Sequence, residues 1–319
     1  MTTGSARGAP HKEKMLKINY FLMQHASGQI PILFMGVIKM KNLGYYNGKY
    51  DEIENMQIPM LDRVCWFGDG VYDATYAHNH IVFDMDAHLT RFYNSAKLLG
   101  MNIPIERDEL DKLLRELVKK VDDGDQFVYM QVTRGNGLRG HIYPENMQGN
   151  LWITLTPCHV ADTYKPIDVI TYEDKRFYYC NCKTLNLIPS CLAATAADRA
   201  GCQEAIFHRG NIVTECAHSN VSIFKDGKVI THQLDDMVLP GTARIRLLAF
   251  AKKLGYEVEE RDYTLDELMS ADEIVVHSTG SFCIPVKTVD GRSVGGKAPE
   301  MLKTIQDALV SDFEEQCKV

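Results

Sequence analysis

Lys183 and Glu215 are the residues whose types and surroundings most directly suggest chemistry. Lys183 lies in an apolar stretch, with Tyr178 and Tyr179 before it and Leu185 after it. Burial in such a stretch favours the neutral amine, which is the form that adds to a carbonyl and makes an imine. Glu215 ends the strand-like run VTE and, taken alone, is better explained as an exposed carboxylate at the end of a strand. The sequence therefore suggests imine chemistry at Lys183, whereas Glu215 needs further support.

Two turns could bind a phosphate group. A phosphate monoester needs cations and backbone N–H groups, which converge at the N-terminus of a helix. The turn LPGTAR at 239–244 would begin such a helix, and HSTGS at 277–281 is a second candidate. The candidate ligands are Arg91, the backbone of Thr242 and Ala243, and the hydroxyls of Ser278 and Thr279. The alternative for Arg91 is a salt bridge on a helix surface.

A glycine-rich segment, VTRGNGLRGHIYPE at 132–145, carries a further cationic pair, Arg139 and His141. The planar guanidinium of arginine matches the two oxygens of a carboxylate, and histidine adds another donor. Without other information, an arginine and a histidine in such a loop are more often solvated. The residue types alone therefore leave both explanations open.

The elements that must position these residues fit two domains, because 319 residues are too many for one ordinary domain. Helical periodicity at 89–99 and 110–121, among short β-branched runs, predicts an α+β first half. Further on, strand-like runs alternate with helical patterns, which predicts a larger α/β domain. We expect an N-terminal extension over 1–39, a small α+β domain over 40–157, a linker over 158–166 and the larger domain over 167–319.

Composition excludes several classes of function. The net charge of −7 and the pI near 5.9 argue against nucleic-acid binding and favour small-molecule chemistry. The cysteines number nine and lack zinc-ligand spacing, so we expect reduced thiols in the cytoplasm and no metal site. The apolar run at 30–38 weakly resembles a signal peptide, but Pro31 and Gly36 interrupt it, and it is too short to cross a bilayer. GDG at 68–70 is not a dinucleotide-binding fingerprint.

Four separated segments together resemble the class IV aminotransferases, which use pyridoxal 5′-phosphate (PLP). They are FGDGVYD at 67–73, HLTRFYNSAKLLG at 88–100, NCKTLNLIPS at 181–190 and VTECAHSNV at 213–221. Within the family, the chain is most similar to the D-amino-acid transaminases, and the resemblance runs from about Tyr45 to about Gln306. It implies the α/β fold of the fold-type IV PLP enzymes, with the cofactor held mainly by the larger domain.

The resemblance also implies roles for individual residues. Lys183 would form the internal aldimine with PLP and move a proton between the substrate and the cofactor, and Glu215 would keep the pyridine nitrogen protonated. The other implied cofactor contacts are Arg91, Arg176, Asn220, Thr242, Ala243, Ser278 and Thr279. The chain departs from the family at 216–219, where Cys-Ala-His-Ser replaces a run that is often serines. It also departs at 241–243, where Gly-Thr-Ala replaces a turn with a bulkier residue before the threonine.

The implied substrate site is a carboxylate trap made by Arg139, His141 and Tyr72. In relatives the loop that carries the arginine and the histidine reaches into the partner subunit's site, so a homodimer is implied. The expected reaction is ping-pong transfer of an amino group from a D-amino acid, D-alanine, to a 2-oxo acid, 2-oxoglutarate. The alternatives are a branched-chain L-amino-acid aminotransferase, an aminodeoxychorismate lyase, and a PLP-binding protein without catalysis.

Overall fold

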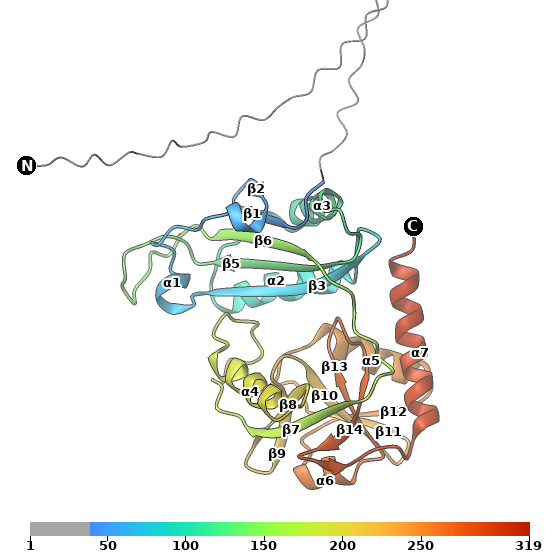
Figure 1. Ribbon diagram of the computed structural model, residues 1–319. Helices are drawn as coiled ribbons and strands as arrows, with labels where there is room; N and C mark the ends of the chain where they lie inside the picture. Colours follow the sequence, from blue (N-terminus) through green and yellow to red (C-terminus); the bar gives the residue numbers. More distant parts are fainter. Residues whose placement is uncertain (1–38) are drawn as a thin grey trace, which may run out of the picture. The chain divides into compact units, whose positions relative to one another are not determined.

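The computed structural model describes residues 39–319. The described residues belong to one compact unit, which ends at Val319. The expected N-terminal extension therefore lies, except for Lys39, outside the described residues. Two β-sheets and the helices that pack on them make up this unit (Figure 1).

The first sheet has six strands, all antiparallel, in the order β2-β1-β6-β5-β3-β4. Along its central strands, buried residues alternate with less buried ones, as expected for a sheet covered on one face. The strands are β1 (Leu43–Tyr46), β2 (Lys49–Asp51), β3 (Gly70–His78), β4 (Ile81–Val82), β5 (Gln126–Thr133) and β6 (Asn150–Pro157).

A tight turn separates β3 from β4. Asn79 and His80 have φ angles of 55° and 60°, and Ala77 pairs with Val82 across the turn. Two consecutive positive φ angles are typical of a two-residue hairpin turn. Asn79 is a residue type that tolerates this conformation, although the turn contains no glycine.

Helices α2 (Met85–Leu98) and α3 (Arg107–Leu117) pack on the first sheet at the positions that helical spacing predicts (Figure 1). Leu89, Phe92 and Ala96 of α2 are buried in the same core as Leu110 and Leu114 of α3. The short helices of this half are η1 (Ile53–Asn55), α1 (Val64–Phe67) and η2 (Val118–Lys120).

The second sheet has nine strands, and its main path runs β12-β11-β10-β13-β14-β7-β8-β9, with β15 paired to β14. It is mixed, because β7 runs parallel to β8 and to β14, and β11 runs parallel to β12. The strands are β7 (Ile167–Glu173), β8 (Glu204–Arg209), β9 (Ile212–Cys216), β10 (Asn220–Lys225), β11 (Lys228–Thr231), β12 (Glu257–Glu260), β13 (Glu273–His277), β14 (Ile284–Val289) and β15 (Arg292–Ser293).

Four helices accompany the second sheet: α4 (Ile188–Arg199), α5 (Thr242–Lys253), α6 (Leu265–Ser270) and α7 (Pro299–Gln316). Helix α4 lies beside β7 and β8, and α7 packs on α5 near the C-terminus (Figure 1). Thr264 caps α6 by accepting a hydrogen bond from the backbone N–H of Glu267, whose side chain bonds back to Thr264. Among the described residues, no helix combines the length and the apolar character needed to cross a membrane.

Each half of the described chain contributes one residue to the hydrophobic core of the other half. Cys182 is buried in the core of the first sheet, whereas Phe83 joins the core around α5 and α7. Residues 158–166 contain no helix or strand and connect β6 to β7. We propose that the two sheets mark the small and large domains expected from the sequence, with these two residues fastening one to the other.

Candidate active site

A cavity of about 450 Å³ lies where β3, the segment that follows β7, and the start of α5 meet. Its volume is within the range of roughly 300–1,000 Å³ that is common for sites that bind small molecules. Of the residues expected from sequence to bind cofactor or substrate, most line it: Tyr72, Arg91, Arg176, Lys183, Glu215, Asn220, Thr242, Ala243, Ser278 and Thr279. Arg139 and His141 do not.

Lys183 is half-buried in the cavity wall and is held by its backbone. Its carbonyl oxygen accepts a hydrogen bond from the N–H of Tyr72 at 3.0 Å, and its own N–H donates to Oγ of Ser95 at 3.2 Å. The Nζ atom lies 4.5 Å from the centre of the Tyr72 ring. The amine is thereby placed beside β3 without a hydrogen-bond partner among the described residues.

Glu215 lies at the end of β9 and is only 5% exposed. Its carboxylate accepts hydrogen bonds from Nη1 of Arg176, from Nδ2 of Asn220 at 2.8 Å and from the N–H of Leu239 at 3.0 Å. Burial raises the pKa of Glu215, and Arg176 and Lys183 act against that rise. The exposed strand-end carboxylate considered from the sequence alone is therefore excluded by the structure.

Arg176 connects Glu215 to a second buried carboxylate. Its Nε and Nη2 atoms donate to Asp174 at 3.0 and 2.9 Å, and its guanidinium lies 4.5 Å from the centre of the Phe207 ring. Arg209 donates to the same Asp174 at 3.1 Å. Two arginines and two carboxylates thus share one buried network, which fixes the plane of the Arg176 guanidinium against the cavity.

Arg91 forms a buried ion pair rather than one on the helix surface. Its Nε and Nη2 donate to Asp73 at 2.8 Å each, and Nδ1 of His88 lies 2.7 Å from the same carboxylate. Burial alone would raise the pKa of Asp73, but Arg91 and His88 outweigh it and hold that pKa well below its usual range. Arg91 Nη1 has no partner among the described residues, so it remains free to bind an anion in the cavity.

The N-terminus of α5 faces the same space. Gly241 is its extended N-cap residue, and the N–H groups of the first turn have no acceptors inside the helix. Oγ1 of Thr242 lies 3.2 Å from Oγ1 of Thr279 and 3.3 Å from Nε2 of His88. A Cβ on Gly241 would clash with Oδ1 of Asn220. These features fit a phosphate: a cation, hydroxyls, free N–H groups and a backbone that leaves no room for a side chain.

Arg139 and His141 lie on the exposed loop that connects β5 to β6, outside the cavity of their own chain. The guanidinium of Arg139 lies 5.4 Å from the centre of the Phe67 ring, which also lies 5.4 Å from the His141 ring. Arg63 holds the turn between them by donating to the carbonyl of Gly140 at 2.7 Å. Within one chain, therefore, the expected substrate trap is not assembled around Lys183.

Sequence reasoning missed Asp73 and His88, although both lie inside the segments that carry the family resemblance. Asp73 is on β3 and His88 is three residues before Arg91 on α2, so both face the same buried point. The i, i+3 spacing of His88 and Arg91 was the available sign of a shared helix face. The carboxylate that joins them could not be assigned without the packing of α2 on β3.

Of the loop of residues 232–241, which joins β11 to α5, the sequence pointed only to the end, 239–241, as part of a phosphate-binding turn. The loop provides the N–H of Leu239 to Glu215 and the carbonyl of Met237 to Nη2 of Arg176 at 3.1 Å. Asp236 accepts hydrogen bonds from Cys180 N–H and from Nδ2 of Asn181, at 3.0 and 2.8 Å. The loop therefore contacts both Glu215 and the segment that leads to Lys183.

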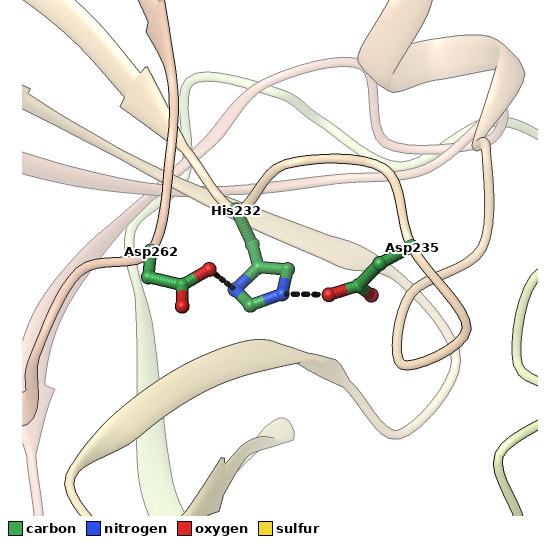
Figure 2. Close-up of side chains that lie close together, drawn as sticks. All are labelled: His232, Asp235 and Asp262. Carbon is green, nitrogen blue, oxygen red and sulfur yellow. Dashed lines mark hydrogen bonds and ion pairs between the residues drawn. The ribbon is translucent and has the colours of Figure 1, made fainter.

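His232 anchors this loop and is 1% exposed. Figure 2 shows its ring between two carboxylates, with Nε2 3.1 Å from Asp235 and Nδ1 3.6 Å from Asp262. The other oxygen of Asp235 accepts from the N–H of Met237 at 2.7 Å. Each carboxylate faces a different nitrogen of the ring, so the imidazole is held between Asp235 and Asp262.

Comparison with known proteins gives the family. The model of the family "Amino-transferase class IV" matches residues 70–289. The D-alanine aminotransferase of Listeria monocytogenes serotype 4b is 36% identical over 85% of this chain and 96% of its own. That of Bacillus licheniformis is 34% identical over 83% and 94%.

Solved structures show the same fold. The branched-chain amino acid aminotransferase of Escherichia coli has a TM-score of 0.79 at 24% identity, covering 88% of this chain and 96% of that one. The T.th. branched-chain amino acid aminotransferase, solved with N-(5′-phosphopyridoxyl)-L-glutamate, has a TM-score of 0.77 at 25% identity, covering 87% and 97%. The expected α/β fold is confirmed. The chain belongs to the class IV aminotransferases, with pyridoxal 5′-phosphate as its cofactor.

Proposed function

We propose that this aminotransferase moves an amino group from a D-amino acid, D-alanine, to a 2-oxo acid, 2-oxoglutarate, in two alternating half-reactions. The carrying observation is that Lys183, Glu215 and the N-terminus of α5 surround one cavity. The relatives named D-alanine aminotransferase, at up to 36% identity among those above, support the choice of a D-amino acid.

Different cavity residues would bind different parts of the cofactor. Lys183 would carry it covalently through Nζ, and Glu215, backed by Arg176, would face the pyridine nitrogen. Arg91 Nη1, the first N–H groups of α5 and the hydroxyls of Ser278 and Thr279 would bind the phosphate. When bound, PLP supplies an electron sink for the pair released when a bond at the substrate Cα breaks.

Lys183 would do the proton transfer. Once the substrate has displaced Lys183 from the cofactor, its amine is free to take the proton from the substrate Cα. The same amine would then deliver that proton to the cofactor. The backbone hydrogen bonds to Tyr72 and Ser95 keep the lysine in place during both steps. Glu215 holds the opposite end of the site at fixed charge, because Arg176 Nη1, Asn220 Nδ2 and Leu239 N–H all donate to it.

The substrate α-carboxylate would meet Tyr72 from the same chain and Arg139 and His141 from the loop of a second copy. The high exposure of that loop supports this arrangement, with Leu138 83% and Ile142 94% exposed. Large apolar side chains so exposed are typical of a surface that another chain covers. A homodimer would thereby complete each site, and Arg139 would fix which hydrogen at Cα faces Lys183.

A visible spectrum of the purified protein tests the proposal. Addition of D-alanine should convert the absorbance of the lysine-bound cofactor to that of its aminated form, and L-leucine should leave it unchanged. The similarity to branched-chain aminotransferase structures makes that activity the second candidate. A response to L-leucine alone would establish the second candidate in place of the first.

We also propose that the reaction takes place in the cytoplasm. All nine cysteines are free, and they lie within the described residues. Several are buried, among them Cys182, Cys216 and Cys283. Free thiols at this frequency are typical of proteins kept in a reducing compartment.

A further inference from the structure

His218 is a cavity residue for which the proposed chemistry has no use. It lies between β9 and β10, three residues after Glu215, in the stretch where this chain departs from its family. It lines the cavity, and 68% of its side-chain surface is accessible. Its Nδ1 atom is 2.7 Å from Oε2 of Glu204, whose side chain is 2% exposed. An accessible imidazole is therefore held from behind by a buried carboxylate.

Glu204 has a full set of donors. Its Oε1 accepts from the N–H of Ala205 at 2.9 Å, and its Oε2 accepts from Oγ of Ser219 at 2.5 Å as well as facing His218. Burial acts to raise the pKa of Glu204, but the bonds from His218 and Ser219 outweigh it and lower that pKa. Ionised Glu204, 2.7 Å from Nδ1 of His218, favours the protonated form of that imidazole.

The protonation of His218 follows from this pairing. The contact with Glu204 raises the pKa of His218, against the opposing effects of partial loss of hydration in the cavity and of the positive charge of Lys183. In the protonated imidazole both ring nitrogens carry hydrogen, and Glu204 uses only Nδ1. Nε2–H has no acceptor among the described residues, so it remains available to a ligand in the cavity.

The other cationic side chains of the cavity are already bound to carboxylates or assigned to the cofactor. Arg176 is bound to Asp174 and Glu215, and Arg91 is bound to Asp73 with only Nη1 left for the phosphate. Lys183 is reserved for the covalent bond to the cofactor. Among the cavity cations of the described residues, His218 is the one that no part of the proposed cofactor or α-carboxylate site uses.

We propose that His218 binds the second carboxylate of a dicarboxylic substrate, which in the proposed reaction is the distal carboxylate of 2-oxoglutarate. This inference rests on the proposed function and adds a residue that selects the substrate class. A charge-assisted N–H donor suits a carboxylate that no other cavity side chain is left to neutralise. Glu204 acts as a positioning residue, because it fixes the ring and holds Nε2–H in place without touching the substrate.

Steady-state kinetics of the holoenzyme with D-alanine as donor test the proposal. Two acceptors are compared: 2-oxoglutarate, with a distal carboxylate, and 2-oxobutyrate, without one. His218→Ala should raise KM for 2-oxoglutarate on the order of tenfold, the loss expected for one charge-assisted hydrogen bond. KM for 2-oxobutyrate should change by less than about twofold. His218→Gln keeps a hydrogen-bond donor but not the charge. Its KM for 2-oxoglutarate should lie between those of wild type and His218→Ala.

His159→Ala is the matched control. His159 is 75% exposed, its Nδ1 lies 2.7 Å from Asp125, and it is not among the cavity residues. Its loss should leave both KM values unchanged. Equal increases for the two acceptors in His218→Ala, or a shifted spectrum of the bound cofactor without a split between acceptors, would overturn the proposal and assign His218 to the cofactor.

A binding measurement separates this inference from the proposed function. Calorimetry of the holoenzyme with glutarate and with propionate needs no turnover, and His218→Ala should weaken glutarate binding alone. Suppose that wild-type protein transaminates no D-amino acid, but that His218→Ala binds glutarate more weakly than wild type while binding propionate equally well. The proposed function then fails and the His218 site stands. If glutarate and propionate bind the variant as they bind wild type, the His218 site fails.

Discussion

Nη1 of Arg176 donates a hydrogen bond to Oε1 of Glu215, and both side chains are largely buried in the wall of the cavity. The pair is held from both ends. Asp174 binds the other side of the guanidinium, and Asn220 and Leu239 bind the remaining oxygen of Glu215. An isolated buried carboxylate tends to take up a proton. Arg176 therefore decides whether Glu215 is present as the anion that the cofactor needs.

Replacing Arg176 by alanine should move the acid limb of the pH profile. Burial already raises the pKa of Glu215, and Arg176 counteracts that rise. Without it, Glu215 should stay protonated to a higher pH, so kcat/KM should begin to rise at a higher pH than in wild type. The profile of kcat/KM from pH 5 to 9 measures this, with Arg292→Ala, an exposed arginine, as the control. An acid limb at its wild-type position would contradict the role given to Arg176.

Replacing Lys183 by alanine should abolish covalent cofactor binding and remove transaminase activity. Lys183 Nζ is the amine that lies at the cavity wall beside Tyr72. Reduction with borohydride followed by mass spectrometry should show cofactor attached to wild type and not to the variant. Lys175→Ala removes an exposed lysine that pairs with Glu173 and should still bind covalently. Attachment persisting in Lys183→Ala would place the bond on another lysine.

Replacing Asp73 by asparagine should destabilise the protein and weaken cofactor binding. It leaves the positive charge of Arg91 buried without its carboxylate, which costs on the order of 3–5 kcal/mol in buried pairs. Urea unfolding should show this loss at pH 7, and dialysis should remove the cofactor sooner than from wild type. Asp122→Asn, at an exposed aspartate, is the control. A variant as stable as wild type would mean that Arg91 finds another partner.

The same substitution has a pH signature. The folded-state pKa of Asp73 lies below the ordinary value of 3.8. Ionised Asp73 therefore stabilises the fold fully above that ordinary value, and the contribution is lost as the pH falls below it, towards the folded-state pKa. The difference in free energy of unfolding between wild type and Asp73→Asn should be constant at neutral pH and shrink below about pH 4. A difference that stays constant into acid would exclude the ion pair as its source.

The sequence contained the cofactor-facing residues because each belongs to a short contiguous motif. Lys183 follows an apolar stretch, although Tyr178 and Tyr179 in it are each 65% exposed and not buried as expected. Thr242 follows a turn that opens a helix. Both line the cavity as expected. Arg91 also lines the cavity. The sequence offered two alternatives for it, a surface salt bridge or an anion site, and neither describes it fully. It is a buried ion pair with one free nitrogen, because α2 packs against β3 and brings Asp73 beside it.

What the sequence could not supply comes from long-range packing. Glu204 and His218 lie at the two ends of the β8–β9 hairpin and meet because β8 pairs with β9, whose end leads into the loop of His218. Residues 232–238 have no motif of their own, and the contacts of the loop 232–241 with Glu215 and Arg176 depend on the fold around it. Arg139 and His141 depend on an interface between two chains, which one sequence does not describe.

Replacing Asp235 by alanine should loosen the loop 232–241 and with it the cofactor. Asp235 faces the buried ring of His232 (Figure 2). It also accepts from Met237 N–H, and the carbonyl of Met237 accepts from Nη2 of Arg176. We expect faster loss of PLP on dialysis and a raised dissociation constant in fluorescence titration. Asp198→Ala, at an exposed position on α4, should behave as wild type. Unchanged retention would show that the loop is held without the His232 clamp.

Replacing Gly241 by alanine should weaken phosphate binding more than it weakens the fold. The added Cβ would clash with Oδ1 of Asn220, so Asn220 has to leave its place between Glu215 and Leu239. Inorganic phosphate competes with PLP for the same N–H groups, so its inhibition constant measures the phosphate site directly. Gly137→Ala, whose new Cβ would meet only the end of the Met147 side chain at 3.4 Å, is the matched control. If Gly241→Ala leaves phosphate and PLP binding unchanged while Asn220 is displaced, the N-terminus of α5 is not the phosphate site. Weaker binding of both phosphate and PLP in Gly241→Ala, with a stable fold, would place the phosphate at the N–H groups of α5. That result would not depend on Arg91.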